Sequence, residues 1–414
     1  MTHALLHPIS RNTLLKLASE LVGRAATFAL SIWAARQLGS FAFGQYNIGL
    51  AQGFVLAQLG DMGLQTLITR EVAVKGQAAQ AVVHTALRCK CALALPVVVL
   101  FWLFSAGNPS PIRLSFLGLG LAMLAQTFLE YAAYVFRGQQ RLRREAQLLA
   151  SARLLTSISG AVALWWGGGL PALALTTLAS VSVIAALAIY SLKRDGWFQS
   201  RPLPFSSPLG YALWQQALPL GVATFLSISY TRLPIFWLEA RLDATAVAQF
   251  SAAQRLIEPM QILPASFLAA LFPAYSQALR RHPRHARRLG WRGALLLSGG
   301  GAAIALLLWL GAPWLISRLY GPEFHDSIPV LQWLSWSVVP AFVNYSLTHY
   351  LIARGQQHWL TLFMGVMLTL HGGLSWLLIP ALGPAGPAIS VLVAETTLLF
   401  ACLGVLANKP SSTG

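Results

Sequence analysis

The amino-acid sequence predicts an all-α, polytopic membrane protein with about twelve transmembrane helices, arranged as two six-helix lobes around a central cationic cavity. Hydrophobic residues make up 56% of the chain and charged residues only 10%, and the mean hydropathy is +0.61. An ordinary soluble domain carries about 25% charged residues. Apolar runs long enough to cross ~30 Å of hydrocarbon recur from end to end. Three arginines, Arg24, Arg232 and Arg255, fall inside these runs.

The expected spans divide into two sets of six. Those in the first half are 13–36, 44–68, 82–106, 112–136, 147–168 and 170–192, and those in the second half are 209–237, 245–277, 293–317, 328–352, 358–380 and 385–407. The polar segment 193–208 lies between the sets and predicts an N-terminal lobe, 1–200, and a C-terminal lobe, 201–414. A short match between Gly44-Gln45-Tyr46 and Ala248-Gln249-Phe250, which open the second and eighth spans, is typical of a parallel repeat. The first twenty residues lack a small-residue cleavage site, so we expect no cleavable signal peptide.

The remaining Lys and Arg residues fall unequally on the two sides of these spans. Apart from the three arginines above, 22 of the 29 Lys and Arg residues lie on one side, and 4 lie on the other. The larger set includes Lys90 and Arg153. The positive-inside rule places the richer side, with both termini, in the cytoplasm. The formal charge of +17 thus follows membrane topology, which argues against a nucleic-acid partner.

A guanidinium at bilayer depth costs at least ~2.5–3.5 kcal/mol and normally faces a protein interior or a watery cavity. We therefore predict that Arg24, Arg232 and Arg255 bind an anionic substrate. Glu20 precedes Arg24 by one turn, in the favourable order for a helical ion pair. Two interpretations are open: Glu20 only neutralises Arg24, or Arg24 faces the cavity and is partly held by Glu20 or Asp61.

Three further carboxylates lie in the second lobe and in the fourth span. Glu258 follows Arg255 at i, i+3, whereas Arg232 has no acid within one turn and contacts either cargo and water or, by snorkelling, the periplasmic surface. Glu130 and Glu395 are candidates for binding a coupling proton or cation, because burial disfavours a charged carboxylate. The alternatives are a helix-end acid for Glu130 and an interhelical hydrogen bond for Glu395.

Several function classes are not favoured. Gly167-Gly168-Gly169 and Gly299-Gly300-Gly301 are not followed by Lys-Ser/Thr, so we expect no nucleotide site. No nucleophile–base set stands in a soluble segment, and the three cysteines lack further ligands, so we expect no enzyme, metal or cofactor. The basic segments 137–147 and 280–292 are expected to attract anionic lipid headgroups, at ~1 kcal/mol per cation. Gathering a polyprenyl phosphate at the cavity mouth is compatible with that role.

Five segments in order carry a resemblance to a known family. ARQLGSFAFGQYNIGLAQGFVLAQLGDMGLQTLITREVA, at 35–73, combines FGQY with a following D-x-G-L. The others are YVFRGQQRLRREAQ (134–147), LYGPEFHDSIPVLQWLSW (319–336), LIARGQQHWL (351–360) and LGPAGPAISVLVAE (382–395). Together they resemble the polysaccharide flippase family of the multidrug/oligosaccharidyl-lipid/polysaccharide exporter superfamily.

The resemblance implies two six-helix lobes around a central cavity and transport by alternating access. It implies a cargo of oligosaccharide on undecaprenyl pyrophosphate, flipped from the cytoplasmic to the periplasmic leaflet of the bacterial inner membrane. Lipid II flippases of this superfamily carry two additional helices, for which this chain has no room, which favours O-antigen (lipopolysaccharide) or exopolysaccharide assembly. A polysaccharide polymerase and a chain-length regulator are expected partners. The competing functions are a multidrug/cation antiporter, whose cationic cargo the three arginines would repel, and a non-transport scaffold of a polysaccharide assembly complex.

Overall fold

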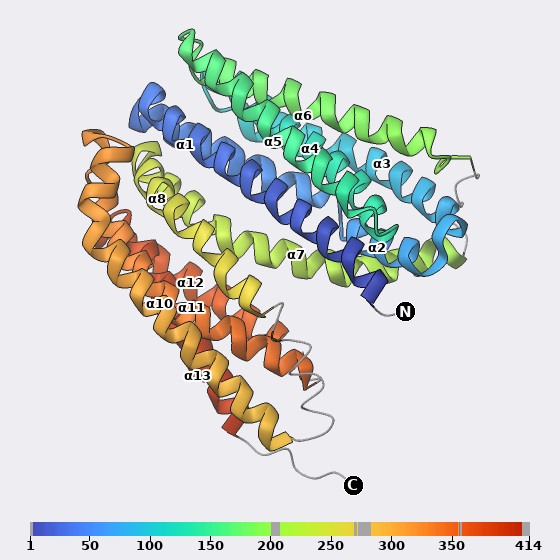
Figure 1. Ribbon diagram of the computed structural model, residues 1–414. Helices are drawn as coiled ribbons and strands as arrows, with labels where there is room; N and C mark the ends of the chain where they lie inside the picture. Colours follow the sequence, from blue (N-terminus) through green and yellow to red (C-terminus); the bar gives the residue numbers. More distant parts are fainter. Residues whose placement is uncertain are drawn as a thin grey trace. The chain divides into compact units, whose positions relative to one another are not determined.

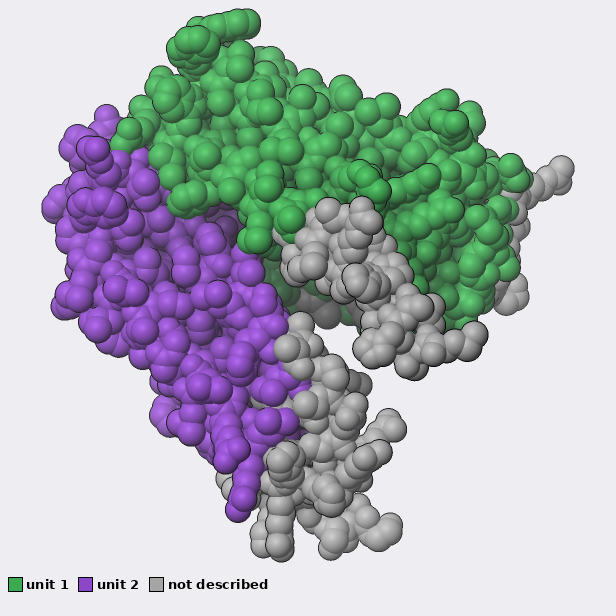
Figure 2. All heavy atoms as spheres, viewed as in Figure 1, with its two compact units in different colours: residues 1–228 green, residues 229–414 purple. Residues whose placement is uncertain are grey.

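The computed structural model describes residues 3–199, 208–268, 271, 283–354, 356 and 358–407, and these residues form helices joined by short turns (Figure 1). Contacts group the chain into two compact units, Met1–Ile228 and Ser229–Gly414 (Figure 2). The predicted lobe boundary near residue 200 stays a prediction. Each unit is described by itself below.

Unit 1 contains a run of long helices in chain order. They are α1 (His3–Leu59), α2 (Leu64–Lys75), the 3-10 turn η1 (Gly76–Ala79), α3 (Gln80–Ser105), α4 (Ser110–Gly138), α5 (Leu142–Trp165), α6 (Gly169–Arg194) and the first part of α7 (Pro208–Arg241). The central helix of the unit is α4, which packs against α1, α5 and α6. Its buried face holds Leu129, Tyr131 and Phe136, and the Tyr131 hydroxyl donates to the Val83 carbonyl at 2.5 Å.

The first two expected spans lie on either side of a kink at Gly39 within α1. The backbone there is non-helical, with φ 73° and ψ 174°, so α1 consists of two helical segments, as expected. The second span is then interrupted by the turn Gly60–Gly63, between α1 and α2. Gly63 has φ +79°, and a Cβ there would lie 2.4 Å from the Ala217 carbonyl oxygen of α7. Both the backbone conformation and the close approach of α7 therefore require glycine.

Unit 2 begins with the rest of α7 and continues through a second series of helices. They are α8 (Ala244–Ile257), the 3-10 turn η2 (Glu258–Gln261), α10 (Pro283–Leu319), η3 (Pro322–Phe324), α11 (Ser327–Ala353), α12 (His358–Leu382) and α13 (Ala385–Ala407). α11 is central and packs against α8, α10 and α13. The expected span 245–277 is interrupted by η2, and its residues 269–270 and 272–277 lie outside the described part of the chain.

Two sequence motifs of the second half meet in unit 2. The Gln249 side chain of α8 donates to the Glu323 carbonyl at 2.7 Å, and the Ser327 hydroxyl donates back to Gln249 Oε1 at 2.7 Å. Gln249 and Ser327 are both buried. The glutamine of the Ala-Gln-Phe motif therefore fixes the turn between α10 and α11 onto α8.

The outer surfaces of the helices are strongly apolar. Trp166, Leu95 and Leu307 are 81%, 72% and 71% exposed, as expected for side chains that face lipid rather than water. Among the described residues, seven helical segments are long and apolar enough to cross a membrane by length and composition alone. The predicted all-α, polytopic membrane fold is confirmed, and the helices are consistent with twelve spans in two lobes.

Candidate functional site

A buried ion pair lies at the break between α1 and α2. Asp61, in the turn that interrupts the second span, accepts a hydrogen bond from Lys90 Nζ of α3 at 2.7 Å. The exposed fractions of the two side chains are 3% and 0%. Irregular backbone at membrane depth occurs where it is covered by protein or lines a cavity, and here the broken helix presents a carboxylate to a lysine.

This pair corrects two expectations. The sequence offered Asp61 as a partner of Arg24, whereas the structure gives it to Lys90. It also counted Lys90 among cytoplasmic cations at a helix end, whereas Lys90 is fully buried. Burying an ammonium without a counter-charge costs several kcal/mol, so the position of Lys90 depends on Asp61.

Glu130 of α4 extends this buried group of charges. Its carboxylate accepts a hydrogen bond from Gln126 Nε2, one turn earlier, at 3.0 Å. It also interacts electrostatically with Asp61, repulsively, and with Lys90, attractively, and the Gln65 side chain adds a further polar contact. Glu130 therefore lies within the charge network of unit 1 and is not an isolated acid.

The Arg24 side of unit 1 contains a second arginine that the sequence did not single out. Arg153 of α5 is half-buried and interacts electrostatically with Arg24, and also with Glu20 and Glu130. Its aliphatic stem lies on α1, where a Cβ at Gly23 would be 3.0 Å from Arg153 Cδ. The small residue at Gly23 lets α5 bring this guanidinium to α1. Arg24 is itself exposed, and its charge and that of Glu20 both act on the Arg153 guanidinium.

Unit 2 contains a similar group of charges. Arg232 of α7 interacts electrostatically with Arg255 of α8, repulsively, and with Glu258 of η2, attractively. Tyr320, which follows the end of α10, interacts electrostatically with both Arg255 and Glu258. Both arginines are half-buried. The structure thus adds Arg232, for which the sequence offered no acid within one turn, to the Arg255–Glu258 group.

Glu395 lines a mainly apolar pocket of about 120 Å³ within unit 2. Asn344 Nδ2 of α11 donates to the Glu395 carboxylate and to its backbone carbonyl, both at 2.8 Å. Tyr230 and Glu258 also line the pocket. The interhelical hydrogen bond that the sequence offered as the alternative for Glu395 is therefore present, and the carboxylate nevertheless reaches a cavity.

His371 also lines this pocket. Its Nδ1 lies 2.7 Å from the Ser390 hydroxyl, which in turn lies 2.7 Å from the Ser375 hydroxyl. The imidazole ring also packs against the Tyr230 ring, with centroids 4.9 Å apart. These contacts join α7, α12 and α13.

The structure offers no metal centre within its described residues. No group of three or more His, Cys, Asp or Glu side chains that could hold a metal ion occurs there. Cys89, Cys91 and Cys402 are free thiols.

The depth of Lys90 and Arg153 in their helices was the signal that could have found them. Lys90 falls inside the expected span 82–106, and Arg153 inside 147–168. The cation distribution assigns both residues to the cytoplasmic side and so does not identify them as buried charges. Because a helix rises 1.5 Å per residue, each residue in fact lies well inside its expected span.

Comparisons with known proteins add the family and the fold. Residues 9–279 match the family described as Polysaccharide biosynthesis protein, and residues 219–377 match the family described as MatE. No curated protein matches the chain.

Solved structures share the fold over nearly the whole chain. An inward-facing multidrug resistance MATE family transporter of the MOP superfamily is 16% identical, with a TM-score of 0.72 over 97% of this chain and 99% of that one. Lipid II flippase MurJ, in an inward closed conformation, is 12% identical, with a TM-score of 0.78 over 96% of this chain and 88% of that one. A MOP superfamily transporter from Pyrococcus furiosus Vc1 is 15% identical, with a TM-score of 0.61 over 96% and 94%. At these identities the likeness concerns the fold.

Proposed function

Because the chain belongs to the polysaccharide biosynthesis protein family and has the fold of MOP superfamily transporters, we propose that it is a lipid-linked oligosaccharide flippase. Its cargo in this proposal is an oligosaccharide repeat unit on undecaprenyl pyrophosphate. The protein moves that cargo from the cytoplasmic to the periplasmic leaflet of the bacterial inner membrane by alternating access. The product serves O-antigen or exopolysaccharide assembly, with a polysaccharide polymerase and a chain-length regulator as partners.

The observation that carries the proposal is a pair of arginines in each unit. Arg24 and Arg153 repel each other in unit 1, and Arg232 and Arg255 repel each other in unit 2. Two guanidinium groups at membrane depth gain most when an anion lies between them, because each offers a planar fork of donors that matches phosphate oxygens. A pyrophosphate has oxygens and charge for two such forks.

The carboxylates near each pair keep the site from binding anions irreversibly. Glu20 interacts with Arg153 in unit 1, and Glu258 interacts with Arg232 in unit 2. Each acid offsets part of the positive charge when no cargo is bound, so the arginines are tolerated in the empty protein. A flippase must release its cargo on the far side, and a competing carboxylate at each pair favours release.

Glu130 and Glu395 are the coupling candidates in this proposal. Glu130 accepts a hydrogen bond from Gln126 and interacts electrostatically with Asp61 and Lys90. Glu395 accepts a hydrogen bond from Asn344 and lines a cavity. A proton or cation that binds at either carboxylate changes the local charge and with it the stability of one transport conformation. Energy then comes from an ion gradient or the membrane potential, at ~2.3 kcal/mol per charge per 100 mV.

The orientation follows from the cation distribution. Both termini lie in the cytoplasm, and the turns near Asn108, Gly168, Arg241, Glu323 and Gly383 lie in the periplasm. Reporter fusions at those five turns test this topology. Cytoplasmic signals from two or more of them would contradict it.

A multidrug or cation antiporter is the second candidate. The pocket of unit 2 supports it, because the carboxylates of Glu258 and Glu395 and the rings of Tyr230, Phe250 and Phe342 line one cavity. Acids and aromatic rings together suit an organic cation. A structural neighbour is described as a multidrug resistance transporter. The paired arginines oppose this candidate, since they would repel the same cargo.

Reconstitution into liposomes separates these functions from each other and from a scaffold. Purified protein should move an undecaprenyl-pyrophosphate-linked oligosaccharide to the outer leaflet without ATP, measured as accessibility of the sugar to an added lectin. Arg24→Ala and Arg153→Ala should each abolish that transfer. Export of a cationic dye by the wild-type protein, with no lipid-linked sugar transferred, would support the antiporter. No transfer of either cargo would support the scaffold.

A further inference from the structure

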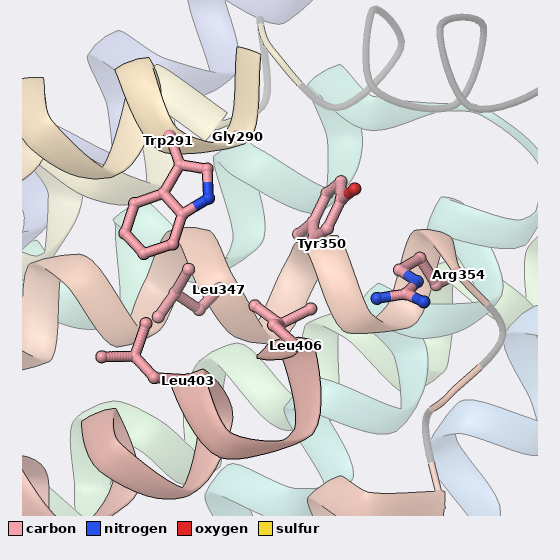
Figure 3. A pocket seen from close by; sticks show the side chains of 7 residues that line it. All are labelled: Gly290, Trp291, Leu347, Tyr350, Arg354, Leu403 and Leu406. Carbon is pink, nitrogen blue, oxygen red and sulfur yellow. The ribbon is translucent and has the colours of Figure 1, made fainter. Parts of the chain in front are cut away.

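A second pocket, of about 230 Å³, lies in unit 2 where α10 begins and α11 and α13 end (Figure 3). Its apolar walls come from Leu347 of α11 and from Leu403 and Leu406 of α13. It has no lining residue in common with the pocket that contains Glu395. The two pockets are therefore separate sites of the same unit.

The pocket is apolar at one end and polar at the other. The three leucines gather beneath the indole ring of Trp291, and the Tyr350 hydroxyl and the Arg354 guanidinium stand beyond them (Figure 3). Trp291 is 45% exposed, so its ring forms an open wall. This arrangement matches a molecule that has both a hydrocarbon chain and a polar head, because Trp and Tyr favour the boundary between hydrocarbon and headgroups.

A glycine opens the pocket from the side of α10. Gly290 is buried, and a Cβ at that position would meet the Tyr350 ring at 3.6 Å. A larger side chain there would extend from α10 toward Tyr350 and occupy the space between the two helices. The sequence therefore leaves room at the point where the apolar and polar ends meet.

The charges around this pocket are of one sign. α10 and α11 contain no Asp or Glu, and the sequence has none in 259–322 or 327–394. The described cations near this end of α10 are Arg288 and Arg292, both exposed, while Arg354 itself lines the pocket. Basic pockets between transmembrane helices on the cytoplasmic side are typical binding sites for anionic lipid headgroups.

We propose that this pocket binds one anionic glycerophospholipid from the surrounding leaflet. An acyl chain lies among the leucines and against Trp291, and the phosphate contacts Arg354. A single arginine matches the one charge of a phosphodiester, whereas the paired arginines of the two units match a pyrophosphate. The pocket also lies apart from Arg232 and Arg255, so the bound lipid is a resident of unit 2 and not the cargo.

Lipid titration of the purified full-length protein in detergent tests this site. Native mass spectrometry counts bound molecules of phosphatidylglycerol, with phosphatidylcholine as the neutral comparison. Phosphatidylglycerol should occupy one site, and Arg354→Gln should weaken it about 10-fold, the effect of one charged hydrogen bond. Arg288→Gln is the matched control, because it removes a cation from the same end of the unit but not from the pocket wall, and it should leave the affinity unchanged.

A pocket-filling variant tests the apolar end separately. Leu403→Trp should block the lipid although every charge remains, provided that its far-UV circular dichroism and its unfolding temperature without lipid match the wild type. If it fails that control, Arg354→Gln alone decides the question. Equal binding of phosphatidylcholine, or equal losses in Arg354→Gln and Arg288→Gln, would overturn the proposal in favour of diffuse adsorption. Displacement of phosphatidylglycerol by a lower concentration of undecaprenyl phosphate would overturn it in favour of a carrier-lipid site.

Discussion

Both units contain two arginines near a glutamate, but the buried carboxylates of the two units have different partners. Each unit places two arginines beside a glutamate, Arg24 and Arg153 in one and Arg232 and Arg255 in the other. In unit 1 the buried Asp61 carboxylate accepts from Lys90 at 2.7 Å, and the buried Glu145 carboxylate pairs with Arg137. In unit 2 the deep acid, Glu395, is held by a neutral amide and lines a pocket.

This difference indicates different roles for the two buried acids. A salt bridge with both partners buried holds the interrupted second span against α3, so unit 1 is fixed at the place where its helix is broken. The Glu395 carboxylate accepts from the Asn344 amide and lines a pocket, so it is accessible to a proton or cation that enters there. We infer that the Asp61–Lys90 pair has a structural role in unit 1, whereas Glu395 of unit 2 and Glu130 of unit 1 remain the coupling candidates.

The largest effect is expected from breaking the closed pair of unit 1. Lys90→Met leaves the Asp61 carboxylate buried without a counter-charge, which costs ~3–5 kcal/mol. The unfolding temperature in detergent and the yield of folded protein should both fall. Asp61→Asn together with Lys90→Met removes both charges and should restore most of the loss. A single variant as stable as the wild type would show that unit 1 does not depend on this pair.

The next effect concerns the arginine pair of unit 1. Arg24→Ala and Arg153→Ala should each cost ~1.5–3 kcal/mol of cargo binding, or roughly 10- to 150-fold in affinity. If both guanidinium groups hold one pyrophosphate, the double variant should lose less than the sum of the two single losses. Polymer export from cells that lack their own flippase measures the outcome. Glu20→Gln with Arg24→Gln, if fully active and normally expressed, would reduce Arg24 to a self-neutralised residue.

Removing either arginine of the unit 2 pair should also lower cargo affinity, and here a lysine substitution should restore part of it. Arg232→Ala should lower cargo affinity as much as Arg255→Ala, because the two arginines interact electrostatically and would share one anion. Lys at position 232 should restore part of it, since lysine keeps the charge but loses the planar fork. Glu258→Gln serves as the control: it removes the competing acid and should tighten cargo binding. An active Arg232→Ala would remove that residue from the site.

The smallest effect on stability should come from Glu395. Glu395→Gln keeps an oxygen that accepts from Asn344 Nδ2 at the same place, so unfolding should change by less than ~1 kcal/mol. Transport in liposomes should nevertheless lose its dependence on an imposed ion gradient. Glu323→Gln, an acid outside the pocket, is the matched control. Unchanged gradient dependence in Glu395→Gln, with Glu130→Gln altered, would move the coupling site to unit 1.

The sequence predicted the architecture well because hydrophobic length is a local signal. The five motifs at 35–73, 134–147, 319–336, 351–360 and 382–395 indicated the family, and the family match over residues 9–279 confirms that recognition. Most helix ends fall within a few residues of the expected ones, as in the α11 span, expected at 328–352 and observed at Ser327–Ala353. The break at Gly60–Gly63 was missed because the apolar run continues across it.

The partners of the charges could not be predicted in the same way. Asp61 and Lys90 are far apart in sequence, and only the packing of α3 on the interrupted second span brings them together. Arg153 reaches Arg24 because Gly23 admits its stem, which is a feature of the α1–α5 contact and not of either helix alone. Pairs within one helix, such as Arg255 and Glu258, were visible from their spacing.

If paired arginines recognise a pyrophosphate, the protein must distinguish two carrier lipids that differ by one phosphate. Purified protein in detergent is titrated with undecaprenyl pyrophosphate and with undecaprenyl phosphate, and the dissociation constants are measured by microscale thermophoresis. The account predicts that the wild type binds the pyrophosphate at least 10-fold more tightly, and that Arg153→Gln loses most of this preference while its affinity for the monophosphate changes little. Equal affinity of the wild type for both lipids, or an unchanged preference in Arg153→Gln, would contradict it.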